Sequence, residues 1–257
     1  MNWLLLFVPA AIGLHLARPE AHAAVFVLAC LAVVPLAGWM GRATEELARR
    51  TGEGIGGLLN ATFGNAAELI LALTALHKGL YPVVKASLTG SIIGNVLLVF
   101  GAAVLAGGIR HERQRFNVTG ARAQSTLLTL AAIALVMPAG FHALAGARGM
   151  ARETGLSLAI AAVLLAAYGA HLVFSLITHK RLFAGEGGGG HPPEWSLHKA
   201  LVVLAGSTAL IAWVSEILVG SVEAAADSLG MTRVFLGVIV VAVVGNAAEH
   251  STAVTMA

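Results

Sequence analysis

The sequence has few charged residues, few aromatic residues and a single cysteine. Only 11% of its 257 residues are charged and 6% are aromatic, whereas soluble domains carry about 25% charged residues. A deficit of this size along the whole chain excludes an ordinary soluble protein. Because Cys30 is the only cysteine, an intramolecular disulfide is excluded, and no Cys/His cluster indicates a soft metal. We assign the net charge of +3 to basic loops of a membrane protein rather than to nucleic-acid binding.

Long apolar segments take the place of the missing charges. The chain is 58% hydrophobic, its mean hydropathy is +0.84, and a helix needs about 20 apolar residues to cross a bilayer. We therefore predict an all-α fold, a polytopic transmembrane helical bundle of about eight spans. The predicted spans are 3–17, 22–41, 54–77, 80–108, 123–145, 154–178, 200–222 and 231–257. The first is short, but it lacks the basic start and the small-residue cleavage site of a signal peptide.

The spans fall into two sets separated by a glycine-rich linker. Four consecutive glycines, Gly187 to Gly190, precede Pro192-Pro193, a composition typical of flexible linkers. The predicted organisation is a peripheral first helix (1–18), a five-span first repeat (19–178), the linker (179–199) and an incomplete second repeat of two spans (200–257).

The distribution of basic residues predicts the orientation. If the eight spans alternate, one face carries ten basic residues: Arg42, Arg49, Arg50, Arg110, Arg113, Arg115, Arg122, Lys180, Arg181 and Lys199. The other face carries the remaining six. Since basic loops favour the cytoplasm, we expect the N-terminus and the linker to be cytoplasmic, in a bacterial-type inner membrane.

One polar motif, Gly-Asn-Ala-Ala-Glu, occurs twice inside the apolar segments. It spans Gly64 to Glu68 in the third predicted span and Gly245 to Glu249 in the eighth. An offset of five spans turns the second copy upside down relative to the first. Inverted repeats whose binding site lies near the membrane midplane are an architecture of secondary transporters.

The paired motifs favour a hard divalent cation. Placing a charged carboxylate within the membrane costs about 2.5–3.5 kcal/mol, so such residues face a partner or an ion path. Glu68 and Glu249 are therefore candidate cation ligands. Ca²⁺ takes 6–8 oxygen ligands, and the bare backbone at Gly64 and Gly245 can supply carbonyl oxygens. Burial favours the protonated form of a carboxyl group, so that H⁺ and Ca²⁺ would exclude each other. The rival interpretation is that the two glutamates only brace helices.

Further polar residues are candidates for supporting roles. Ser87, Ser91 and Asn95 recur every four residues and share one helix face, either as a lining of the ion path or as ordinary small-residue packing. Three others are candidates for a proton relay or for cation access: Glu45, Glu216 and His250. Glu45 is also compatible with a solvated position, and His250 with a bystander role.

These motifs resemble the cation/proton exchanger family, the Ca²⁺/H⁺ antiporters of the wider Ca²⁺/cation antiporter group. The matching stretches are 35–41, Thr44 to Leu47, Gly56 to Leu69, Gly90 to Val99, Ser215 to Gly220 and Gly237 to His250. The related Na⁺/Ca²⁺ exchangers carry a Gly-Thr-Ser-x-Pro-Glu type of motif, so the present one favours the proton-coupled branch.

The resemblance implies one extra helix followed by two inverted five-helix repeats. It also implies that Glu68 and Glu249 bind the cation with carbonyls near Gly64 and Gly245, and that Asn65 and Asn246 hold the half-sites together. Relative to the family, three closing helices are missing and the linker lacks an acidic segment.

We therefore expect a transporter that exports Ca²⁺ from the cytoplasm in exchange for H⁺, with no enzymatic activity and no cofactor. The expected partners are the two ions and lipid, and homo-oligomerisation is left open. The alternatives are an antiporter coupled to Na⁺ or selective for Mn²⁺, and a truncated, non-transporting membrane protein.

Overall fold

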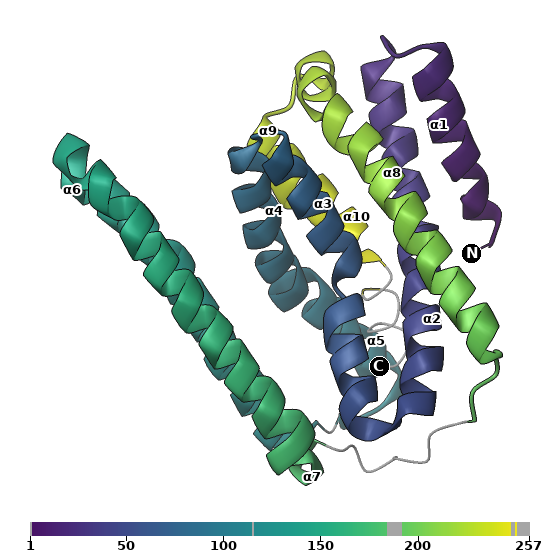
Figure 1. Cartoon of the computed structure of the whole chain (residues 1–257), viewed down its shortest axis with the longest axis vertical. Helices are drawn as coiled ribbons and strands as arrows, with labels where there is room; N and C mark the ends of the chain where they lie inside the picture. Colours follow the sequence, from purple (N-terminus) through teal and green to yellow (C-terminus); the bar gives the residue numbers. More distant parts are fainter. Residues whose placement is uncertain (1, 115, 184–191, 248–249, 251–257) are drawn as a thin grey trace. The chain divides into compact units, whose positions relative to one another are not determined.

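The computed structural model describes residues 2–114, 116–183, 192–247 and 250. Within these ranges every regular element is a helix and none is a strand, which confirms the predicted all-α class (Figure 1). The α-helices are α1 (Phe7–Ala17), α2 (His22–Phe63), α3 (Ala66–His77), α4 (Tyr81–Ile93), α5 (Phe100–Arg110), α6 (Val118–Val173), α7 (Lys180–Phe183), α8 (Leu197–Leu229), α9 (Arg233–Phe235) and α10 (Ala242–Gly245). Four further segments are the 3₁₀ turn η1 (Asn2–Leu6) and the π-helical segments η2 (Gly94–Val99), η3 (Phe174–Thr178) and η4 (Leu236–Val241).

Five helical segments are long and apolar enough to cross a membrane. They are His22–Thr51, Tyr81–Arg110, Val118–Leu144, Arg152–Thr178 and Leu197–Leu229. Three shorter apolar helices, Trp3–Ala17, Ala66–His77 and Leu236–Gly245, lie within the remaining predicted spans, and the last two cover only part of them. The chain is an integral membrane protein; the number of spans and the repeat relationship stay predictions.

The chain divides into two compact units. Unit 1 comprises Met1–Gln114 and His191–Ala257, and unit 2 comprises Arg115–Gly190. The predicted first repeat, 19–178, therefore extends over both units, and the fifth and sixth predicted spans make up most of unit 2.

Unit 2 is a helical hairpin. His142 Nδ1 lies 2.9 Å from Glu153 Oε2, although eleven residues of straight helix would separate them by about 16 Å. The chain within α6 must therefore reverse between these two residues. At the open end of the hairpin, the Asn117 side chain donates a 2.6 Å hydrogen bond to the Leu182 carbonyl.

The core of unit 1 is the packing of α2 against α8. Both helices supply large buried apolar side chains: Val25, Phe26, Val33 and Met40 from α2, and Ile211, Val214, Leu218 and Val222 from α8. Glu46, late in α2, contacts Trp195, just before α8. Val25, early in α2, shares a cavity with Ser221, late in α8. The two helices therefore run in opposite directions (Figure 1).

The predicted end of the second span at Gly41 is wrong. The helix α2 continues through the charged segment, where Ala43, Thr44 and Leu47 are buried, and its stretch apolar enough to cross a membrane runs to Thr51. A side chain at Gly56 would lie 2.6 Å from the Ala48 carbonyl oxygen. Since eight residues of straight helix span about 12 Å, the chain folds back sharply between Ala48 and Gly56.

Backbone-to-backbone packing joins α4 to η4. A Cβ at Gly90 would overlap the backbone of Val238, and one at Gly237 would lie 2.8 Å from Ala86 Cβ. Small residues allow membrane helices to approach this closely. This contact brings the face of α4 that carries Ser91 beside the second copy of the repeated motif.

Candidate cation-binding site

Both copies of the repeated motif interrupt a helix at Gly-Asn. In the first copy α2 ends at Phe63, Gly64 and Asn65 form a turn, and α3 starts at Ala66. In the second copy α10 ends at Gly245 and Asn246 lies in a turn. Interrupted helices inside a membrane protein place free backbone groups where a cavity or a ligand can use them.

Glu68 lies in the first turn of α3. The positive end of the helix dipole there favours a negative charge on its carboxylate. Its Oε1 accepts a 2.6 Å hydrogen bond from Ser91 Oγ and a second hydrogen bond from Asn246 Nδ2. The side-chain amide of the second copy thus donates a hydrogen bond directly to the carboxylate of the first copy.

Asn246 is only 1% exposed. Its Nδ2 also donates to the Ala242 carbonyl at 2.9 Å and lies 3.1 Å from Ser91 Oγ. Its Oδ1 is buried without a hydrogen-bond partner in the described part of the chain. A buried acceptor left unpaired is costly, by about 1–3 kcal/mol, so this oxygen is ready to accept a donor or a cation.

Gly245 makes the approach of the two copies possible. A Cβ at this position would lie 3.1 Å from Glu68 Cγ, closer than ordinary van der Waals contact. Glycine therefore allows the second motif to lie directly against the Glu68 side chain.

A second polar contact lies one helical turn away. His250 Nε2 lies 3.2 Å from Asn95 Oδ1. Ser91 and Asn95 are four residues apart, as are Asn246 and His250, so the two pairs form successive cross-links between neighbouring elements. Ser87 is partly buried on the same face of α4.

In the described part of the chain, the hydrogen bonds of the Glu68 side chain come from Ser91 and Asn246 and from no other predicted site residue. Glu249 lies outside the described residues. Gly64 and Asn65 are exposed, and Glu45 is exposed on α2. Glu216 is exposed and pairs with Lys78 at 3.1 Å. Among the residues that the structure describes, no three His, Cys, Asp or Glu side chains are grouped to hold a metal ion.

Sequence reasoning overlooked two partners of acidic residues. Glu46, beside the singled-out Glu45, is the buried member of that pair and accepts from the Trp195 backbone N–H at 3.1 Å. Lys78 pairs with Glu216. The three-residue spacing from Glu46 to Arg49 is a signal for an ion pair on one helix face. The Glu46–Trp195 and Lys78–Glu216 contacts join residues far apart in the chain, and one sequence carries no signal for them.

Comparison with known proteins supports the resemblance drawn from the motifs. The family model described as sodium/calcium exchanger protein matches residues 21–177 and 199–257. The chain is 45% identical to the Ca²⁺/H⁺ antiporter ChaA of Bacillus subtilis, over 91% of this chain and 68% of that protein. It is also 45% identical to a Ca²⁺/H⁺ antiporter of Aphanothece halophytica, over 99% of this chain and 72% of that protein.

A solved structure agrees with the sequence relatives. The crystal structure of the selenium-substituted Ca²⁺/H⁺ antiporter YfkE matches with a TM-score of 0.78 and 38% identity, over 100% of this chain and 73% of that one. The predicted resemblance to the cation/proton exchangers is therefore confirmed, and the chain belongs to the sodium/calcium exchanger protein family.

Proposed function

We propose that the protein exchanges Ca²⁺ for H⁺ across a membrane. The observation that carries this proposal is the direct hydrogen bonding of Glu68, from the first motif, to Asn246, from the second. The similarity to proteins named Ca²⁺/H⁺ antiporters supports the same choice of ions.

Glu68 is the group at which the two ions compete. In a low-dielectric site a carboxylate is stable only with a proton, a counter-cation or strong donors. A proton on Glu68 is displaced when a divalent cation binds its oxygens. We assign the second carboxylate to Glu249, so that two glutamates balance the double charge of Ca²⁺.

Ser91 and Asn246 hold the Glu68 carboxylate in position between cation-binding events. Both now donate to Oε1, so a cation that binds this oxygen must displace at least one donor. When the Asn246 amide turns away, its unpaired Oδ1 becomes available as an additional hard oxygen ligand. Backbone carbonyls beside Gly64 and Gly245 complete the oxygen set.

The proposed direction is export of Ca²⁺ from the cytoplasm, driven by inward movement of H⁺ across a bacterial-type inner membrane. The N-terminus is cytoplasmic in this arrangement, because the face with ten basic residues lies inside. The protein needs no cofactor and performs no enzymatic reaction.

The test is transport in proteoliposomes. We expect an imposed pH gradient to drive ⁴⁵Ca²⁺ uptake, and external Ca²⁺ to collapse that gradient, as reported by a pH-sensitive dye. Because the family description includes sodium exchange, an imposed Na⁺ gradient is the matched alternative. Uptake driven by Na⁺ without proton movement, or no uptake under either gradient, would contradict the proposal. A parallel assay with Mn²⁺ tests the selectivity.

A further inference from the structure

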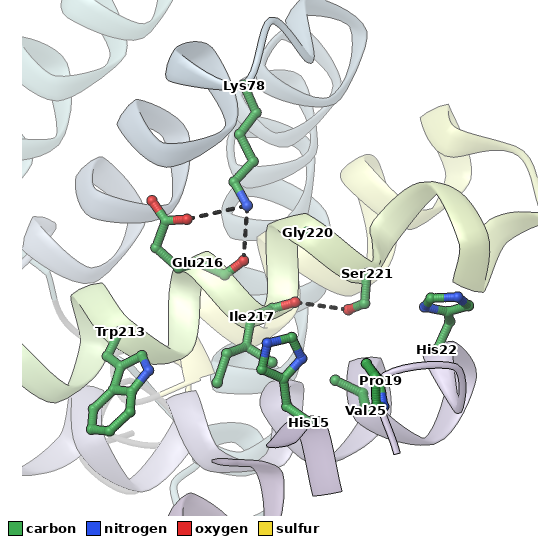
Figure 2. Close-up of a pocket in the computed structure, with 10 residues that line it drawn as sticks. All are labelled: His15, Pro19, His22, Val25, Lys78, Trp213, Glu216, Ile217, Gly220 and Ser221. Carbon is green, nitrogen blue, oxygen red and sulfur yellow. Dashed lines mark hydrogen bonds and ion pairs between the residues drawn. The ribbon is translucent and has the colours of Figure 1, made fainter. Parts of the chain in front are cut away.

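A cavity of about 330 Å³ lies at the end of unit 1 where α1, α2, α3 and α8 meet. It is separate from the Glu68 contacts, since α3 carries Glu68 in its first turn and Lys78 at its C-cap, about 15 Å apart along the helix. Figure 2 shows His15 and His22 at one side of the cavity and Lys78 with Glu216 at the other.

Lys78 makes two contacts with one residue of α8. Its Nζ lies 3.1 Å from Glu216 Oε2 and donates to the Glu216 carbonyl oxygen, also at 3.1 Å (Figure 2). The side chains of Lys78 and Glu216 are 32% and 55% exposed. Ion pairs as exposed as this contribute little to stability and are screened by salt, so opening this pair costs little free energy.

Gly220 provides the space that the ammonium group occupies. A Cβ at Gly220 would lie 3.1 Å from Lys78 Nζ. One turn before it on α8, Glu216 supplies the only carboxylate among the described residues that line the cavity. Trp213, also on the cavity wall, lies three residues from Glu216 and is exposed.

We propose that the ammonium group of Lys78 neutralises the Glu216 carboxylate until a divalent cation enters the cavity and displaces this ammonium group from Glu216. The cavity is thus a low-affinity binding site for a hydrated divalent cation, with Glu216 as its carboxylate. Because Lys78 competes with the cation for Glu216, it raises the cation concentration at which the site is half occupied. The role in transport rests on the proposed Ca²⁺/H⁺ exchange, whereas the displacement itself is measurable without transport.

The test is a titration of the purified protein with Tb³⁺, a luminescent substitute for Ca²⁺ that is excited by energy transfer from a nearby tryptophan. Trp213 is the sensitiser, so Trp213→Phe identifies the signal that arises from this cavity. We expect Lys78→Met to tighten this Tb³⁺ binding by about two- to fivefold, the effect of removing one exposed ion-pair partner. Lys78→Arg restores the wild-type affinity, and Glu216→Gln removes the signal.

Two matched variants separate displacement from a general change of charge or fold. Lys85→Met removes an exposed cation of α4 that has no ion-pair partner among the described residues, and its Tb³⁺ affinity is expected to stay at the wild-type value. Gly220→Ala keeps Lys78 but crowds its ammonium group, and is expected to tighten binding slightly. An unchanged affinity in Lys78→Met, or an equal change in Lys85→Met, would overturn the proposal.

The same variants in proteoliposomes connect the cavity with transport. We expect Lys78→Met to lower the Ca²⁺ concentration for half-maximal uptake, without changing the maximal rate, when Ca²⁺ is supplied on the side of the membrane to which the cavity opens. If the wild-type protein does not exchange Ca²⁺ for H⁺, the proposed function fails while the Tb³⁺ titration still decides the role of Lys78. If exchange occurs but Lys78→Met leaves both measurements unchanged, only the role of Lys78 fails.

Discussion

Two acidic residues of unit 1, the buried Glu46 and the partly buried Glu68, differ in what neutralises them. Glu46 is 5% exposed, pairs with Arg49 at 3.1 Å and accepts from the Trp195 backbone. Glu68 accepts only from neutral donors, Ser91 and Asn246, in the described part of the chain.

The difference separates a carboxylate with a built-in cationic partner from the one to which the proposed exchange assigns the transported ions. A buried charge needs a partner, and Glu46 has a permanent one. Further contacts hold the same region: Arg50 donates to the Trp195 carbonyl, and Lys199 lies 4.4 Å from the centre of the Trp195 ring. Glu68 has hydrogen-bond donors but no Lys or Arg partner among the described residues. In the proposed exchange its compensating charge comes from a proton or from Ca²⁺.

The largest expected effect is that of Glu68→Gln. The amide is nearly the same size as the carboxylate, but it cannot ionise and so cannot exchange a proton for Ca²⁺. We expect the initial rate of pH-driven ⁴⁵Ca²⁺ uptake to fall by about 100-fold or more, which corresponds to about 2.7 kcal/mol. The melting temperature in detergent should change little. Glu112→Gln, an exposed carboxylate in the segment after α5, is the matched control. Uptake above half the wild-type rate in Glu68→Gln would show that Glu68 is dispensable.

A smaller loss is expected for Asn246→Ala. This change removes one hydrogen bond to a charged carboxylate, which is worth about 1.5–3 kcal/mol, together with the free Oδ1. We expect about 10- to 100-fold weaker Ca²⁺ uptake at low Ca²⁺ concentration, with part of the loss recovered at saturating Ca²⁺. Asn60→Ala, an exposed asparagine on α2, should behave as wild type; an equal loss there would mean that Asn246 has no special role.

Glu46→Ala should affect stability rather than ion exchange. Removing this carboxylate leaves Arg49 and the Trp195 N–H without their buried partner, and because Arg49 is partly exposed we expect a destabilisation of about 1–3 kcal/mol. Glu45→Ala, its exposed neighbour, should stay within about 0.5 kcal/mol of wild type. Thermal unfolding in detergent measures both. Transport per folded molecule should be retained in Glu46→Ala, and a loss as large as that of Glu68→Gln would abolish the distinction between the two carboxylates.

The sequence predicted the parts of this site that depend on local pattern. The interruption at Gly64 follows from the flexibility of glycine inside an apolar helix, and the shared face of Ser91 and Asn95 follows from helical periodicity. The repeated motif also predicted that its two copies would meet, and Glu68 does contact Asn246. The role of Glu249 stays a prediction.

Contacts between distant residues could not be predicted from one sequence. Glu45 and Glu46 are adjacent and identical in type, yet successive residues of a helix point about 100° apart, and only tertiary packing decides which is buried. The predicted break at Gly41 failed for a similar reason, because burial of Ala43 and Leu47 near Trp195 extends the helix beyond a residue of low helix propensity. The pairing of Lys78 with Glu216 likewise depends on how α3 packs against α8.

The most direct test of the role of Glu68 is the number of protons released when Ca²⁺ binds. Purified protein in weakly buffered detergent solution, at a pH where the empty site is protonated, is titrated with Ca²⁺ while a dye reports pH. We predict that wild-type protein and Glu46→Gln release protons in proportion to the Ca²⁺ bound, and that Glu68→Gln releases fewer protons and binds Ca²⁺ more weakly. Undiminished proton release and Ca²⁺ binding by Glu68→Gln would contradict the assignment of Glu68 as the carboxylate shared by the two ions.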